Sequence, residues 1–342
     1  MKKFLPVLLL VALCTAAKAQ DDPGAYMTSI TNAETNMDKA YMTYISAAAH
    51  SSRKRKVEKL RGNAVDAIVT CQNDINYITP YKGDNSLRQN ALNYVQLCYK
   101  VFNDDYAHIV NMEDITERSY DEMQAYLLLQ QATNDTLQVA IARMSNAENS
   151  FATKYNVTII NQQTELDQKM EESNRMAAYH DKVYLLFYKC NWEDNQLTNA
   201  VNEKNVTKIE QTRSALGKYA IEGLAVLDTL KSYAGDFSLA GACKNALAFY
   251  KEEAETEVPK VTDFFLKEEA FDKLKTTMDA KSSDQRTQQD VDTYNKAVND
   301  INAAVNAYNQ TNNDLNGGRT AVNNGWNDTE KTFIDFHTPY YK

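Results

Sequence analysis

The residues best suited to bind a charged ligand form a basic run near the start of the chain. Arg53, Lys54, Arg55 and Lys56 are consecutive, and two more basic residues follow within the next five positions. Clustered lysine and arginine side chains bind phosphate groups, sulfated glycans and lipid headgroups. The solvated first turn of a helix is the alternative interpretation, although cations at a helix N-terminus oppose the helix dipole. Both interpretations stay open at this point.

Residues that could perform catalysis or bind a metal are few and widely spaced. No two of the four histidines stand four residues apart, so zinc chemistry of the H-E-x-x-H type is absent. The sequence contains no C-x-x-C, no G-x-S-x-G, no P-loop and no dinucleotide-binding glycine motif. Asp105-x-x-His108 occurs once, whereas a di-metal helical bundle needs a second such pair. We therefore predict a protein that is not an enzyme and holds neither metal nor cofactor.

Cysteine and tyrosine residues are interpreted first as packing residues. The cysteines beyond the N-terminal segment lie in apolar helical patterns, and the spacing of Cys71 and Cys98 neither excludes nor favours a disulfide. Tyrosine is abundant, with 21 copies, and Tyr81 and Tyr233 open two similar turns, Y-K-G-D and Y-A-G-D. Such rings pack in a core and pin a helix hairpin. The alternative is that Tyr81 and Tyr233 form aromatic platforms for glycans or partner proteins.

The first 19 residues have the pattern of an export signal. A lysine pair precedes an apolar stretch at 5–13, and A-K-A at 17–19 matches a cleavage site that would leave Gln20 as the first residue. We expect an exported protein, periplasmic or secreted. Lipidation at Cys14 is the alternative, and Leu13 disfavours it because a lipobox has a small residue directly before the cysteine. Removing the segment leaves 34 basic against 46 acidic residues, a net charge of −12, which disfavours nucleic acid as a partner. No later stretch approaches the roughly 20 apolar residues of a membrane span.

The composition indicates long helices. The chain has 10 glycines and 5 prolines, where average usage would give about 24 and about 17. Residues that end helices are therefore scarce, which excludes turn-rich sandwiches, barrels and propellers. We predict an all-α fold.

Short blocks of sequence recur roughly 150 residues apart. Y-K-G-D-N-S-L at 81–87 and Y-A-G-D-F-S-L at 233–239 share five of seven residues at a spacing of 152. Other blocks match at spacings from 143 to 157, and the last of them pairs Phe151 with Tyr308. We interpret this as a tandem duplication of two four-helix up-down bundles. The predicted units are 20–161 and 162–318, followed by an aromatic C-terminal tail at 319–342.

The positions of the helices follow from apolar spacing and from the few turn residues. Pro259 is predicted to interrupt the third helix of the second unit, and Gly317-Gly318 to close the last helix. The aromatic tail is expected to dock back on a bundle, because many exposed rings would be costly. The predicted helices are 24–50, 52–78, 86–110 and 119–155 in the first unit, and 164–202, 206–234, 238–255 continued by 260–281, and 283–316 in the second.

Two sets of short motifs resemble a known family. G-D-x-x-L at 83–87 followed by N-A-L at 90–92, and F-A-T-K-Y-N at 151–156, are similar to exported helical surface proteins of Bacteroidota and spirochaetes, the ErpY-like group. The likeness covers about half of the chain. It implies a helical protein that binds partner proteins, and it offers no catalytic residues. Spirochaetal members are described as lipoproteins, and this sequence departs from them at the lipobox.

The function expected from these observations is binding without catalysis. We expect an exported helical bundle whose aromatic and polar helix faces bind another protein or a component of the cell envelope. Duplication would offer two related surfaces and thus bivalent binding. The alternative is a glycan or small-ligand binding protein that uses the groove between the two units. The oligomeric state is left open by the sequence.

Overall fold

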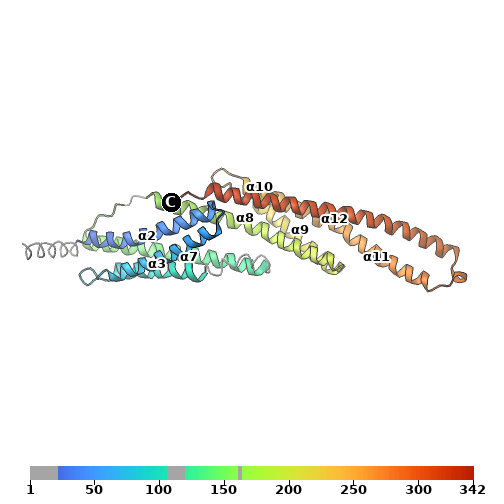
Figure 1. Cartoon of the computed structure of the whole chain (residues 1–342), viewed down its shortest axis with the longest axis horizontal. Helices are drawn as coiled ribbons and strands as arrows, with labels where there is room; N and C mark the ends of the chain where they lie inside the picture. Colours follow the sequence, from blue (N-terminus) through green and yellow to red (C-terminus); the bar gives the residue numbers. More distant parts are fainter. Residues whose placement is uncertain (1–21, 106–119, 161–163) are drawn as a thin grey trace, which may run out of the picture. The chain divides into compact units, whose positions relative to one another are not determined.

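The computed structural model describes residues 22–105, 120–160 and 164–342, and the regular elements in these ranges are all helices (Figure 1). The predicted all-α class is therefore confirmed. The predicted export signal and His108 lie outside the described residues. The elements are α2 (Pro23–His50), α3 (Lys54–Tyr77), α4 (Ser86–Lys100), the π-helical segment η1 (Val101–Asp105), α7 (Tyr120–Tyr155), α8 (Glu165–Asn202), α9 (Val206–Thr229), α10 (Ser238–Glu252), the π-helical segment η2 (Glu253–Glu257), α11 (Val258–Asp279), the 3-10 turn η3 (Ser283–Gln285) and α12 (Gln288–His337).

The chain forms two compact units. Unit 1 comprises the residues up to 175 together with 335–342, and unit 2 comprises residues 176–334. α8 and α12 each contribute residues to both units, whereas α2, α3, α4 and α7 belong to unit 1 and α9, α10 and α11 to unit 2. Each unit has its own core of buried apolar side chains.

Local sequence explains where several helices begin. The Asp22 carboxylate accepts hydrogen bonds from the backbone N–H of Gly24 at 2.8 Å and of Ala25 at 3.3 Å, and Pro23 opens the first turn of α2. Asn205 caps α9 in the same way, through the backbone N–H of Lys208 at 3.0 Å. These caps satisfy N–H groups that have no partner inside the helix.

The two Y-x-G-D turns have the same geometry. Gly83 and Gly235 have φ of 83° and 85°, a region that favours glycine. The carboxylates of Asp84 and Asp236 accept a hydrogen bond from the backbone N–H two residues on, at 2.9 Å and 2.7 Å. The second turn therefore repeats the geometry of the first, 152 residues later.

Each turn leads into a helix that continues as a π-helical segment. η1 begins at Val101 and η2 begins at Glu253, again 152 residues apart. The predicted interruption at Pro259 is wrong, because α10, η2 and α11 follow one another without a gap. Pro259 lies in the first turn of α11, where a missing backbone N–H is tolerated.

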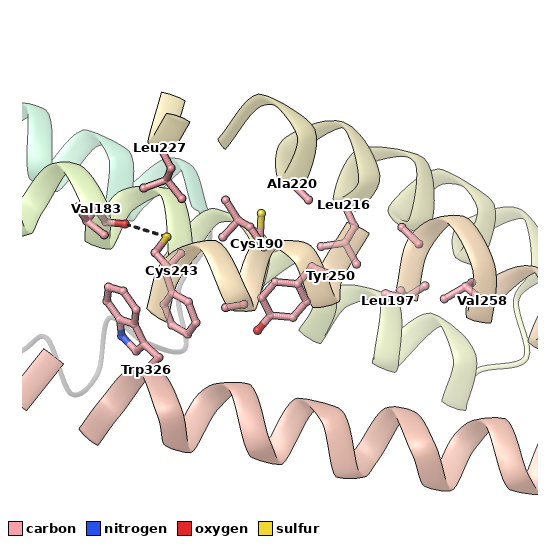
Figure 2. Close-up of a cluster of buried hydrophobic side chains, with 14 of the residues drawn as sticks. Val183, Cys190, Leu197, Leu216, Ala220, Leu227, Cys243, Tyr250, Val258 and Trp326 are labelled. Carbon is pink, nitrogen blue, oxygen red and sulfur yellow. Dashed lines mark hydrogen bonds between the residues drawn. The ribbon is translucent and has the colours of Figure 1, made fainter. Parts of the chain in front are cut away.

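The core of unit 2 draws side chains from α8, α9, α10 and α12. Figure 2 shows Val183, Cys190, Leu216, Cys243 and Trp326 within this cluster. The Trp326 ring of α12 stacks on Phe187 of α8, with ring centroids 4.3 Å apart and planes 9° from parallel. This ring therefore fixes the register of α12 against α8.

The predicted end of the last helix at Gly317-Gly318 is wrong. α12 runs through both glycines to His337, so most of the predicted tail is helix. A Cβ atom at residue 318 would overlap the ring of Phe249, whereas residue 317 faces open space. Gly318 thus permits a close approach to α10. Trp326 and Phe333 of the predicted tail are buried, while Phe336 and Tyr340 remain exposed.

Three aromatic rings meet with the same geometry in both units. In unit 1, Tyr26 lies 5.5 Å from Tyr81 at 46° and 5.2 Å from Phe151 at 25°. In unit 2, Tyr179 lies 5.6 Å from Tyr233 at 43° and 5.8 Å from Phe333 at 28°. Phe333 therefore occupies the place of Phe151.

The predicted match of Phe151 with Tyr308 is consequently wrong. Tyr308 stacks on Phe264 of α11 instead, at 4.4 Å. The spacing between corresponding residues grows from 152 at the turns to 182 at the last ring, so unit 2 has 30 additional residues between them. At a spacing of 182, the 36 residues of α7 correspond to residues 302–337 of α12. The additional residues therefore fall between η2 and residue 302.

Candidate functional site

The basic run lies on the surface at the start of α3. Arg53, Lys54, Arg55 and Lys56 are all exposed. Arg53 is the N-cap residue, and its backbone N–H donates to Ser51 Oγ at 3.2 Å. Exposure is compatible with both a solvated helix start and an anion-binding patch.

The two tyrosines considered as surface platforms are core residues. Tyr81 is only 3% exposed, and its ring contacts Tyr26, Phe151 and Tyr155. Tyr233 is half-buried against Tyr179 and Phe333. A role as binding surface therefore does not apply to Tyr81, and Tyr233 offers only part of its ring.

The four cysteines of the described residues are free thiols. Cys71, Cys190 and Cys243 are buried, and Cys98 is half-buried. Burial raises the pKa of Cys71, Cys98 and Cys190 to about 12. At neutral pH these groups are thiols, and only the thiolate is a good nucleophile. They act as small apolar residues, as expected from their helical pattern.

A buried charged cluster in unit 2 was not foreseen from the sequence. Arg319 of α12 donates from Nε to Asp194 Oδ1 of α8 at 2.8 Å, and from Nη2 to Glu253 Oε1 at the start of η2. The exposed fractions of these side chains are 14%, 4% and 0% in the order Arg319, Asp194 and Glu253. One guanidinium therefore joins three helical elements, and we call these three residues the charged triad.

An uncharged polar layer lies one helical turn from the charged triad. Asn191 Nδ2 donates to the Tyr250 hydroxyl and to Asn323 Oδ1, both at 3.0 Å. These residues precede or follow the members of the triad by three or four positions on the same helices, so the two layers stack along the helix axes. Polar groups of α8, α10 and α12 thus meet in a core that is otherwise apolar.

The triad has one positive group for two carboxyl groups. Burial, together with repulsion from Asp194, raises the pKa of Glu253 to about 8, and Arg319 opposes the shift. Burial also raises the pKa of Asp194, against the attraction of Arg319. Glu253 Oε2 is buried and accepts no hydrogen bond. A proton shared between the two carboxyl groups gives this oxygen a partner, so the triad is electrically balanced when it holds one proton.

Unit 1 builds the same framework without these charges. At the spacings set by the turns and rings, Val101 corresponds to Glu253 and Leu137 to Arg319. Tyr41 corresponds to Asp194 when α2 is matched to α8 through Tyr26 and Tyr179, and it packs edge-on against Phe102 at 5.1 Å. The positions of unit 1 that match the charged triad are therefore uncharged. The triad could have been detected in the sequence only by comparing the two units in the correct register.

A second polar cluster lies in unit 1. Burial raises the pKa of Glu34 to about 8, with Glu148 and Asp38 adding to the shift. Burial likewise raises the pKa of Asp38 to about 7, and Asp167 contributes. Glu34 Oε1 is buried without a hydrogen-bond partner. These carboxyl groups therefore bind protons more readily than ordinary surface acids do.

His180 of unit 2 is held in its charged form. It hydrogen-bonds through Nε2 to Glu330 at 2.7 Å and through Nδ1 to Asp181 at 3.2 Å. Burial alone would lower the pKa of His180, but the two carboxylates outweigh burial and raise the pKa to about 9. The residue is an ion-pair partner at neutral pH and has little capacity as a base.

An open groove runs between α11 and α12. Its volume is about 610 Å³, and all of its lining residues belong to these two helices. Phe271, Leu274 and Ile301 are half-buried along it, while Lys267 and Asp300 are exposed at its edges. Several alanines complete the lining: Ala270, Ala297, Ala303, Ala304 and Ala307. The groove is open to solvent, and most of its lining residues are apolar.

No family model matches the chain, and neither a curated protein nor a solved structure matches it. Among the described helices, none has the length and apolar content needed to cross a membrane. Within the same residues, no group of three or more His, Cys, Asp and Glu side chains is arranged to hold a metal ion.

Proposed function

We propose that this chain is an exported, non-enzymatic helical-bundle protein that binds a protein or cell-envelope partner through the hairpin of α11 and α12. The observation that carries the proposal is the open apolar groove between these helices. We call the hairpin, residues 258–307, the arm. It consists of α11, the connecting turn and the first part of α12.

The proposal includes a tandem duplication of four-helix bundles. Its support is the repetition of the Y-x-G-D turn and of the π-helical segment at a spacing of 152. The group of three aromatic rings described above, which has matching geometry in the two units, supports it as well. On this basis the arm contains the 30 residues that unit 2 has in addition to unit 1. An element present in only one of two related units is not required for their common fold. It is therefore the strongest candidate for a function specific to this chain.

The two helices of the arm contact each other, but they do not enclose a core. Phe271 meets Tyr294 with ring centroids 5.9 Å apart, and Lys281 pairs with Asp290 at 2.8 Å near the turn. Leu266 and Val305 are nevertheless 50% and 37% exposed. Two paired helices with a half-exposed apolar seam favour a helical partner, since the i, i+3, i+4 anchors of such a partner fit a groove between helices.

Site-specific photo-crosslinking tests this function. A photoreactive amino acid at Ala303, in the groove, should give adducts of higher mass when the mature chain is irradiated in an envelope fraction of its own cells. The matched control is the same amino acid at Thr277, which is exposed on α11 and does not line the groove. Equal labelling at both positions, or no adduct at Ala303, would contradict the proposal.

A further inference from the structure

The identity of the partner can be argued from the arm itself, and the argument rests on the proposed function. In the bodies of both units, several helices surround each apolar core: Ile30, Ile68, Leu87 and Phe151 come from α2, α3, α4 and α7. The arm has two helices and one open face. A second arm placed on that face would complete a four-helix cross-section.

The two helices that line the groove carry opposite charges, one on each helix. Phe271 contacts Tyr294, and Phe264 contacts Tyr308. Lys267 of α11 and Asp300 of α12 both line the groove, and both side chains are exposed.

This arrangement is complementary to itself. In a pair of arms related by a two-fold axis parallel to the helices, α11 of each copy lies opposite α12 of the other. Lys267 then meets Asp300 of the second copy, and the symmetry produces this contact twice. Lys267 pairs with Asp263 of the same chain, one helical turn away at 2.6 Å, and both side chains are more than half exposed. Such a surface pair contributes little, so Lys267 can turn to a second carboxylate.

We propose that the groove of the arm is occupied by a second copy of this chain, whose own arm packs face to face to form a four-helix bundle. The alanines of the lining leave space for Phe271, Leu274 and Ile301 of the second copy. Because the contact area of two short helices is at the lower end for stable complexes, we expect a reversible dimer whose population rises with concentration.

Sedimentation equilibrium of the mature chain over a range of concentrations tests the proposal. The wild-type chain should dimerise, and Lys267→Glu and Asp300→Lys should each weaken the dimer at least about tenfold, because each places like charges together twice. An equimolar mixture of the two variants should dimerise again, since both cross-contacts then join opposite charges. This recovery also shows that each variant is folded.

The matched controls are Lys275→Glu and Asp292→Lys, which change the same charges on the same helices away from the groove. They should leave the dimer unchanged. A wild-type chain that stays monomeric throughout, or a dimer that is indifferent to Lys267→Glu and Asp300→Lys, overturns the inference. A monomeric chain that still crosslinks a different protein from Ala303 would overturn this inference alone, whereas no adduct at Ala303 would overturn the proposed function as well.

Discussion

Arg319 of α12 donates a hydrogen bond to Glu253, whose side chain is completely buried at the first residue of η2. The same guanidinium bonds Asp194, so a single positive group serves two carboxyl groups that belong to different helices. In unit 1 the corresponding residues are Leu137, Val101 and Tyr41. The comparison shows which charges the framework can do without, and it suggests the substitutions that measure their effect.

Replacing Arg319 alone should be strongly destabilising. Arg319→Leu leaves Asp194 and Glu253 buried without their positive partner, and the free energy of unfolding should fall by about 3–5 kcal/mol. The triple variant Asp194→Tyr, Glu253→Val and Arg319→Leu installs the residues of unit 1, and it should recover most of this loss. Urea unfolding followed by circular dichroism measures the free energy of unfolding of the single and the triple variant. A single variant as stable as the wild type would show that the triad is not buried in solution.

The two adjacent glycines of α12 should respond in opposite directions. Gly317→Ala adds a methyl group in open space on a continuous helix, so the free energy of unfolding should rise by about 0.5–1 kcal/mol. Gly318→Ala forces the ring of Phe249 to move, and the free energy of unfolding should fall by roughly 1–3 kcal/mol. If α12 instead ended at these residues, one of the two glycines would have a left-handed backbone conformation. Replacing that glycine with alanine would then destabilise the chain through backbone strain, and Gly317→Ala would not stabilise it.

The stability of unit 1 should decrease as the pH rises from about 4.5 to about 8. The pKa of Glu34 is raised to about 8 in the folded chain, above its ordinary value of 4.5. The folded state therefore binds this proton more tightly than the unfolded state. The stabilisation is complete below pH 4.5 and is lost as the pH passes 8. Glu34→Gln should remove on the order of 2 kcal/mol of this dependence, measured as unfolding free energy at pH 5 and pH 8.

His180 should contribute a second loss of stability at higher pH. Its pKa is raised to about 9 by Asp181 and Glu330, against the ordinary value of 6.5. The stabilisation is therefore fully present below pH 6.5 and disappears as the pH rises through 9. His180→Gln, which keeps a donor for Glu330 without a charge, should make the melting temperature less dependent on pH between 7 and 9.5. An unchanged pH profile would mean that His180 is not ion-paired.

The basic run should not be needed for binding through the arm. The triple variant Arg53→Glu, Lys54→Glu and Arg55→Glu should give the same crosslinked adduct from Ala303 as the wild-type sequence. Because acidic residues suit the first turn of a helix, Arg55→Glu alone should also stabilise α3 by about 0.3–1 kcal/mol. Loss of the adduct in the triple variant would instead support the anion-binding interpretation of this patch.

The helices that begin or end at clear cap or turn residues could be predicted from the sequence. The start of α2 at Asp22-Pro23, the turn at Gly83 and the end of α7 near Tyr155 follow from caps and turn residues that act locally. The course of α12 could not, because a glycine pair is the usual sign of a helix end. Its actual role depends on Phe249, which is distant in the sequence.

The charged triad could not be found from local sequence for a related reason. Glu253 stands in an acidic stretch that a regular helix would expose to solvent on most of its faces. The π-helical segment adds a residue to one turn and changes which side chains face the core. The open groove likewise depends on contacts between α11 and α12, such as that of Phe264 with Tyr308, which local sequence does not reveal.

The paired π-helical segments also allow the changes in this chain to be ordered in time. Under the proposed duplication, a feature found at the same place in both units was present in the single ancestral bundle, and this applies to η1 and η2. Among the described residues, the arm and the charged triad occur in unit 2 and have no counterpart in unit 1, so the two units came to differ in these features after the duplication.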